Sequence, residues 1–350
     1  MINRTVIRTR ALQVAYSHFK REKTTIDVTL KELENSLRET YDLYLHFLGL
    51  IPDLTEFHSD VLRAKQQKHM PTEDEKNPNM KLANNALAKL LRQNTILNDY
   101  EAEAMHNWRS DDAMLSRLLT KILQSNIYEA YLADIDSLRA DCKFWLDVFK
   151  HIIFVDEDLA DFLELESLYW DNSLFLIEKF ESEELPDIER VEDEVEELKK
   201  NPDLYQSVRA ETSPVEIVKD FVLKTIKQVK KTTPVEEIVS PMYKDDEDEM
   251  FAVNLLSKTI EGSCHYREIL DKYLNNWDSE RVADIDMILM QMALCEFFEM
   301  PDIPVRITIN EYIELSKMFS TSKSYSFVNG VLDNVATEFK KNGMILKANK

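Results

Sequence analysis

Glycine is scarce in this 350-residue chain, which contains four glycines in all. They are Gly49, Gly262, Gly330 and Gly343, and none has another glycine within five positions. The dinucleotide-binding fingerprint and the P-loop both need clustered glycines, so that the backbone can approach a phosphate group. The sequence therefore excludes both of these nucleotide-binding motifs.

Cysteine is equally rare. Cys142, Cys264 and Cys295 are far apart, odd in number and in no metal-binding spacing. This pattern is typical of buried thiols in a reducing compartment. The N-terminus also lacks the apolar segment of a signal peptide, and no apolar run reaches the roughly 18 residues of a membrane span. We expect a cytoplasmic protein.

Constellations of catalytic or metal-binding residues are missing as well. The seven histidines form no His-x3-His pair, which is a common zinc-ligand spacing. Cys264 and His265 are adjacent, but adjacent helical side chains point in different directions and cannot form a nucleophile–base pair. We therefore expect no enzyme activity, no cofactor and no metal. An enzyme site in the middle of the chain stays open as an alternative.

Apolar residues rarely alternate with polar ones, whereas the helical spacing i, i+3, i+4, i+7 is frequent. The ten prolines fall where a helix could begin or end. The sequence therefore predicts an all-α protein. We expect helices near residues 5–20, 27–48, 53–69, 80–108, 111–132, 136–152, 156–182, 187–200, 214–230, 247–275, 279–299, 305–319 and 323–341.

The formal net charge is −22, but it is unevenly distributed. Residues 1–23 carry +5 and residues 301–350 carry +2, so residues 24–300 carry −29. An acidic body disfavours indiscriminate binding of nucleic acid, while two basic ends could form one local phosphate-binding site. Charge alone favours the plainer interpretation, a soluble body with solvated N-terminal arginines.

The first predicted helix combines cations with aromatic groups. Arg4 and Arg8 are one turn apart and can point to one side, whereas Arg10 lies on another side. Tyr16 and Phe19 follow near the other end of the helix. Guanidinium groups for phosphates and aromatic faces for bases are the usual means of binding single-stranded RNA. Ile7, Ala11, Val14 and His18 form the stripe expected to be buried.

The last fifty residues read as two amphipathic helices joined by a polar loop at residues 320–324. Thr308 and Glu311 have capping-box spacing, which predicts a helix start near Ile309. Asn329-Gly330 lies inside a strong helical period rather than in a turn, so we interpret Gly330 as a position of close helix packing.

These segments resemble the NusB family of transcription antitermination factors. The C-terminal helices, from Ile309 to Lys317 and from Phe327 to Asp333, carry the most specific similarity. Arg4, Arg8, Ala11, Gln13 and Tyr16 resemble the family's arginine-rich first helix. The similarity covers about residues 1–45 and 247–340.

The resemblance implies a NusB-like helical bundle built from both chain ends. We expect residues 1–45 with 247–276 to form its N-terminal half, and residues 277–341 its C-terminal half, followed by a tail at 342–350. Residues 46–246 form an acidic helical insertion in this reading. Its tryptophans, which include Trp108, Trp145 and Trp170, indicate that the insertion folds around a core.

The resemblance also implies a function. The family binds the boxA element of ribosomal-RNA leader transcripts together with NusE, a small-subunit ribosomal protein, within the RNA polymerase antitermination complex. Carried onto this chain, the RNA-binding residues are Arg4, Arg8, Arg10, Tyr16, Lys323, Ser324, Ser326, Phe327 and Asn329. Glu311 and Glu314 are the candidates for the contact with NusE.

The loop before the last helix departs from the family pattern. Ser320 stands where glycine is usual, Lys323 where many relatives have an acid, and Ser326 where many have lysine. One cation is gained and one is lost, so the RNA-binding face is rearranged. Together with the acidic body, this leaves a second interpretation open: a helical protein-interaction scaffold in transcription or ribosome assembly that no longer binds RNA itself.

Overall fold

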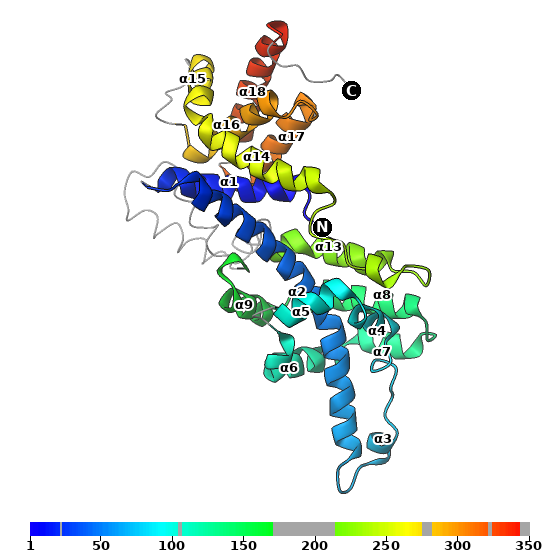
Figure 1. The fold of residues 1–350 in the computed structure, drawn as a ribbon. Coiled ribbons are helices and arrows are strands. Elements are labelled where there is room, and N and C mark those ends of the chain that lie inside the picture. The colour runs from blue at the N-terminus through cyan, green and yellow to red at the C-terminus, as the bar shows by residue number, and fades with distance from the viewer. Residues whose placement is uncertain (22, 104–106, 171–213, 275–281, 321–323, 344–350) are drawn as a thin grey trace. The chain divides into compact units, whose positions relative to one another are not determined.

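The computed structural model describes the whole chain except residues 22, 104–106, 171–213, 275–281, 321–323 and 344–350 (Figure 1). Its described residues form helices and no strand, which confirms the prediction of an all-α protein. They divide into two compact units. Unit 1 contains Met1 and the described residues of 39–171 and 214–242, and unit 2 contains those of 2–38 and 243–350.

Unit 2 contains described residues from the first and the last part of the chain. Its helices are α1 (Arg4–Lys20), the first part of α2 (Ile26–Gln66), α14 (Asp246–Glu261), α15 (Ser263–Tyr273), α16 (Asp284–Glu299), α17 (Val305–Phe319) and α18 (Ser324–Lys341). Helix α16 lies at the centre, because α1, α14, α15, α17 and α18 all pack against it.

The central position of α16 explains its composition. Its residues from Ile285 to Phe297 are all buried, so it is enclosed on every side rather than on one stripe. Helix α1 is buried almost as completely, from Val6 to Tyr16 with only Gln13 half-buried. A helix enclosed on all sides must bury its polar groups along with its apolar ones. This fact decides where the arginines of α1 lie.

Unit 1 comprises the rest of α2 and a set of shorter helices. They are α3 (Glu73–Lys76), α4 (Ala86–Arg92), α5 (Thr95–Glu103), α6 (Asp112–Leu123), α7 (Asn126–Ala133), α8 (Leu138–Val148), α9 (Glu157–Glu166) and α13 (Pro214–Gln228), with short 3-10 turns at Trp108–Ser110, Leu168–Trp170 and Val235–Glu237 and a π-helical turn at Phe149–Ile153.

The core of unit 1 is aromatic. Trp145 and Trp170 are fully buried, and Phe47, Phe149 and Phe154 contact one another edge-on or at a tilt. A hollow of about 180 Å³ beside His46 and Trp108 is smaller than the roughly 300 Å³ at which ligand sites begin. A second hollow of about 420 Å³ in this unit is lined by Lys121, His151 and Asp156, among others, so the alternative of an enzyme site in unit 1 stays open.

Several predicted helix boundaries were wrong. We expected a break at Pro52, but helix α2 runs through it. The proline removes one backbone hydrogen bond, and the burial of its neighbours Leu50 and Ile51 keeps the helix packed there. The predicted helix at 247–275 is broken at Gly262, where an added Cβ would lie 2.6 Å from the Tyr266 ring. The predicted helix at 187–200 lies outside the described residues.

The C-terminal helices also differ in detail from expectation. Helix α17 covers the predicted range 305–319, but it begins at Val305 rather than near Ile309, so Thr308 lies within the helix and does not cap it. Gly330 is exposed on α18, and an added Cβ would meet nothing within 4 Å. The interpretation of Gly330 as a close-packing position is therefore wrong.

Candidate nucleic-acid interface

Helix α1 presents its three arginines in three different environments. Asn3 caps the helix by accepting a hydrogen bond from the backbone N–H of Val6 at 2.9 Å. Arg4 follows directly and keeps part of its side chain exposed. Its Nε donates to Asp248 on α14 at 2.9 Å, and its guanidinium lies over the ring of Phe251. A phosphate group that binds Arg4 must compete with that carboxylate.

Arg8 is buried at the centre of unit 2, with 3% of its side chain exposed. Its Nε and Nη2 donate to the two oxygens of Glu296 on α16, at 2.6 and 3.0 Å. Its Nη1 donates to Glu311 on α17 at 3.2 Å. Burial by itself would lower the pKa of Arg8, but the hydrogen bonds and charge of Glu296 raise it above its ordinary value.

The Glu296 carboxylate is the hub of this network. Besides the two bonds from Arg8, it accepts hydrogen bonds from Thr308 Oγ1 at 3.0 Å and from the Tyr312 hydroxyl at 2.8 Å, both on α17. The group is fully buried, so these donors replace the water that an ionised carboxylate would otherwise bind. The network therefore fastens α1 to α16 and α17.

Arg10 points to another side of α1 and is also buried, with 2% of its surface exposed. Its Nη1 donates to Gln13 Oε1 at 3.1 Å, and burial lowers the pKa of the guanidinium to about 10. We expected Arg8 and Arg10 to contact RNA phosphates. The structure corrects that expectation, because neither guanidinium reaches the surface and Arg8 is neutralised by the protein's own carboxylates.

The exposed cations of α1 lie at its other end. Lys20 and Arg21 are exposed, and Lys20 donates to Asp284 in the first turn of α16 at 2.5 Å. Lys20 also lies over the Tyr16 ring at 5.5 Å, and Phe19 next to it is 39% exposed. Tyr16 itself is largely buried. The sequence analysis named Phe19 as an aromatic group beside Tyr16, but it did not place Phe19, Lys20 or Arg21 among the RNA-binding residues.

The start of α18 also packs against the start of α16. Ser320 and Ser324 hydrogen-bond to each other at 2.9 Å and to Asp286 of α16. Burial raises the pKa of Asp286, and the bonds from these two hydroxyls oppose that rise. Asp284 thus contacts the end of α1, and Asp286 contacts the start of α18. The first turn of α16 joins these two segments, which are far apart in the sequence.

The other predicted RNA-binding residues lie along α18. Ser326 is exposed, whereas Phe327 and Asn329 are half-buried and Ser324 is buried. Lys323 lies outside the described residues. Arg4 and Lys20 are sixteen positions apart, so about 24 Å of helix separates them. The end of α1 and the start of α18 therefore each contact the first turn of α16, whereas Arg4 lies at the other end of α1.

The two glutamates expected to contact a protein partner differ in availability. Glu311 is half-exposed and accepts hydrogen bonds from Thr5 Oγ1 at 2.9 Å and from Arg8. Glu314 is more exposed and pairs with Lys317 on the same helix at 2.7 Å. Glu311 therefore takes part in holding α1, while Glu314 has only a local surface partner.

Two further properties concern the described residues alone. They contain no group of three His, Cys, Asp or Glu side chains placed to hold a metal ion. None of their helices is both long and apolar enough to cross a membrane.

Comparison with known proteins identifies the family. The NusB family model matches residues 215–337. The transcription antitermination protein NusB of Salinibacter ruber is 32% identical over 110 residues, which cover 31% of this chain and 69% of that protein. NusB of Bacillus subtilis is 32% identical over 107 residues, which cover 31% of this chain and 82% of that protein.

A third relative, NusB of Natranaerobius thermophilus, is 36% identical over 87 residues, covering 25% of this chain and 63% of that protein. No solved structure matches the chain significantly. The matched part is a minority of this chain. The family model takes in residues 215–246, which the sequence analysis assigned to the insertion, and does not reach residues 1–45. The chain belongs to the NusB family of transcription antitermination proteins.

Proposed function

We propose that this protein is an RNA-binding antitermination factor that recognises boxA-type sequence in ribosomal-RNA leader transcripts together with NusE. Membership of the NusB family is the main support. The observation in the structure that supports it is the exposed end of α1, where the cations Lys20 and Arg21 follow the exposed ring of Phe19 and Lys20 contacts the first turn of α16. Cations beside an exposed ring suit single-stranded RNA.

Within this proposal, Lys20 and Arg21 provide the main phosphate contacts. Arg21 is exposed and forms no ion pair with any described residue, so binding a phosphate displaces no protein carboxylate. Lys20 exchanges its exposed contact with Asp284 for an RNA phosphate. Arg8 contributes indirectly, because its bonds to Glu296 and Glu311 hold α1 in place.

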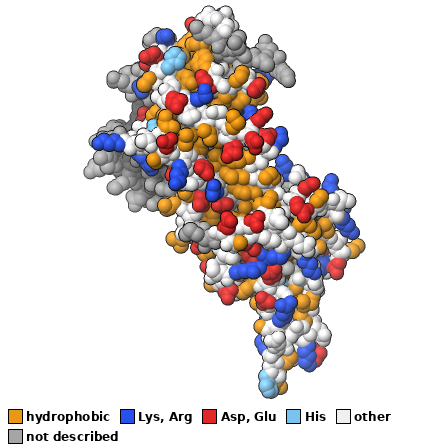
Figure 2. Space-filling view, viewed as in Figure 1, with side chains coloured by type: hydrophobic (Ala, Val, Ile, Leu, Met, Phe, Trp, Pro, Cys, Tyr) orange, Lys and Arg blue, Asp and Glu red, His pale blue; other side chains and the backbone are white. Residues whose placement is uncertain are grey.

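The acidic charge of the protein gives NusE a clear role. Figure 2 shows acidic and basic side chains interspersed over the visible face, with no broad basic surface. The net charge of −22 opposes the approach of RNA at long range. A cationic ribosomal protein bound near Glu314 would offset this repulsion and extend the surface that holds the RNA.

The test is a titration of the protein with boxA-type RNA and with a scrambled RNA, with and without NusE, at several salt concentrations. We expect tighter binding of the boxA-type RNA and a further gain with NusE. Each phosphate contact on single-stranded RNA contributes about 0.7 to the slope of log K against log salt. Replacing Lys20 and Arg21 by alanine should therefore make that slope less steep by about 1.4.

A matched control removes two other positive charges. Lys340 and Lys341 are exposed at the far end of α18, roughly 24 Å along the helix from Ser324. Replacing both by alanine changes the net charge equally and should leave the slope unchanged. An equal effect of the two double variants would show that net charge, and not this site, governs binding.

The burial of Arg8 and Arg10 favours a second candidate, a scaffold that binds protein partners but not RNA. Two of the three arginines carried over from the family motif are inaccessible to phosphate in this chain. If boxA-type RNA binds no better than scrambled RNA even with NusE present, the scaffold function replaces the RNA-binding one.

A further inference from the structure

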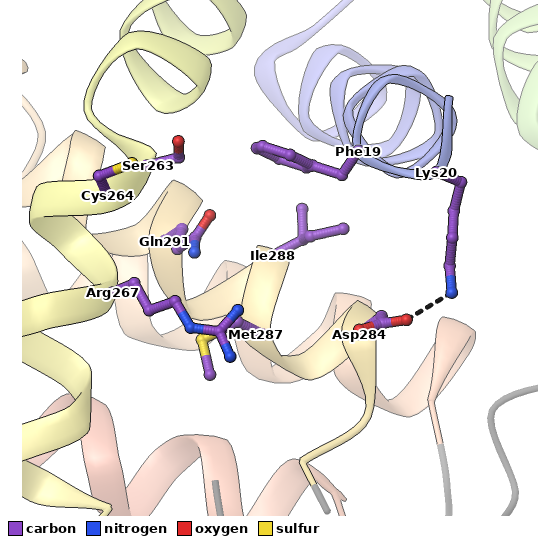
Figure 3. Close-up of a pocket in the computed structure, with 9 residues that line it drawn as sticks. All are labelled: Phe19, Lys20, Ser263, Cys264, Arg267, Asp284, Met287, Ile288 and Gln291. Atoms are coloured by element: carbon purple, nitrogen blue, oxygen red, sulfur yellow. Dashed lines mark hydrogen bonds and ion pairs between the residues drawn. The ribbon is translucent and has the colours of Figure 1, made fainter. Parts of the chain in front are cut away.

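A hollow of about 410 Å³ opens on unit 2 beside the end of α1 (Figure 3). Ligand sites for small molecules usually measure roughly 300–1,000 Å³, so the space suits one nucleotide. The walls come from three helices: Phe19 and Lys20 from α1, Ser263, Cys264 and Arg267 from α15, and Asp284, Met287, Ile288 and Gln291 from α16.

Gln291 points to a ligand. Its side chain is 5% exposed, and its Oε1 has no hydrogen-bond partner among the described residues. A buried amide oxygen without a donor destabilises the protein, because it has lost its hydrogen bonds to water and forms none within the protein. Figure 3 shows the amide reaching into the space between Ile288 and Arg267. An N–H group of a ligand in the hollow would satisfy the oxygen.

The apolar walls define the shape of that ligand. Met287 and Ile288 are buried, while the Phe19 ring is 39% exposed and borders the hollow (Figure 3). An exposed aromatic face suits a flat ring that stacks on it. A nucleobase has such a face and carries N–H donors at its edge, so one base can contact Phe19 and Gln291 together.

The rim of the hollow carries the charge that a nucleotide needs. Arg267 is exposed and forms no ion pair with any described residue. It lies across the hollow from Lys20, which binds Asp284 (Figure 3). A guanidinium without a carboxylate partner is a ready ligand for phosphate, which it can bind through two parallel hydrogen bonds.

We propose that this hollow holds one unstacked nucleotide of the bound single-stranded RNA. The base stacks on Phe19 and donates an N–H to Gln291 Oε1, and a neighbouring phosphate binds Arg267. The proposal rests on the proposed RNA-binding function and deepens it, because Gln291 then reads one base while Lys20 and Arg21 anchor the backbone without regard to sequence.

The test compares two variants with a matched control in RNA titrations over a range of salt. Gln291→Leu keeps the size of the side chain and removes the acceptor, so we expect about fivefold weaker binding with an unchanged salt slope. Arg267→Ala should lower the slope by about 0.7. Arg306→Ala removes another exposed arginine, on α17 and outside the hollow, that forms no ion pair with any described residue, and should change neither quantity.

Base reading has its own signature. Replacing each base of the RNA in turn should reveal one position at which the wild type discriminates and Gln291→Leu does not. Thermal unfolding of each variant checks that the fold is intact, and Gln291→Glu offers a second substitution, which should weaken binding further because it adds a negative charge to the hollow.

The outcomes separate this proposal from the proposed function. If the wild type binds boxA-type RNA and both hollow variants bind equally well, the hollow is not part of the RNA site but the protein still binds RNA. If the wild type does not bind RNA, both proposals fail. Titration with free nucleoside monophosphates identifies the source of the nucleotide: tighter binding of a free monophosphate than of RNA would overturn the RNA subsite.

Discussion

The buried Arg8–Glu296 pair allows the sharpest prediction about stability. Glu296→Gln preserves the shape of the side chain but removes the charge that compensates Arg8. Breaking a buried ion pair by removing one partner costs about 3–5 kcal/mol, because a buried charge is left without its counterion. Glu311 retains one contact with Arg8 and is half-exposed, so we expect a loss near the lower limit, about 3 kcal/mol.

The assay must assign the loss to unit 2, because a chain with two compact units does not unfold in one step. Denaturant unfolding followed by hydrogen exchange and mass spectrometry achieves this. Peptides from α1 and α16 should lose protection in the Glu296→Gln variant, while peptides from α8 in unit 1 should not change.

The same helix provides the control. Glu299 is an exposed glutamate on α16 that pairs with Lys258 at 2.5 Å. Glu299→Gln should cost less than about 1 kcal/mol, because water screens an exposed pair. Equal losses for Glu296→Gln and Glu299→Gln would refute the conclusion that Arg8 is held in a buried network.

A double variant tests the pairing itself. Arg8→Met removes the buried cation, so combining it with Glu296→Gln should cost less than the sum of the two single changes by about 2 kcal/mol. If Arg8 is structural, the double variant also keeps the salt slope for RNA. If the slope becomes less steep by about 0.7, Arg8 does contact an RNA phosphate.

Three further predictions concern both units. His58 is 4% exposed and burial lowers its pKa to about 4. As the pH falls below 6.5, the unfolded chain therefore binds the proton before the folded chain does, and the free energy of unfolding decreases. This free energy should be about 2–3 kcal/mol lower at pH 4.5 than at pH 7, and His58→Phe should remove the difference. Asp53 is buried and accepts bonds from Arg92 at 2.6 Å and Arg109 at 2.9 Å. Both arginines are partly exposed and keep Glu56 as a partner, so Asp53→Asn should cost about 1–2 kcal/mol in denaturant unfolding, and no measurable loss would contradict these bonds. Gly330→Ala should raise the melting temperature, with a gain of about 0.5–1 kcal/mol, because the position is helical and open; a destabilised variant would contradict the absence of neighbours around Gly330.

The helical segments were largely readable from local pattern. The apolar spacing of α1, α17 and α18 placed each helix within four residues of its observed ends. Local pattern failed at Pro52, where the surroundings of α2 tolerate a lost hydrogen bond, and at Thr308, whose capping spacing was coincidental. Helix starts depend on a few backbone hydrogen bonds, which distant packing can shift by a turn.

The candidate site was readable only in part. The sequence indicated that α1 and the C-terminal helices act together, and they lie in one unit. Helical spacing also grouped Arg4 with Arg8 correctly, since both guanidiniums lie over Phe251. What spacing could not reveal was that this side of α1 faces inward at Arg8. The hollow beside Gln291 was invisible for the same reason, because residues from three separate helices form it.

The sequence by itself determined the helical class of this protein, the exclusion of glycine-rich nucleotide-binding motifs and the resemblance to NusB proteins, because composition and local spacing carry that information. Tertiary structure alone decided which cations reach solvent. Glu296 follows Arg8 by 288 positions, and only folding brings its carboxylate to within 2.6 Å of that guanidinium. A charge enclosed by packing needs a counterion inside the protein, and once paired it is no longer available to RNA.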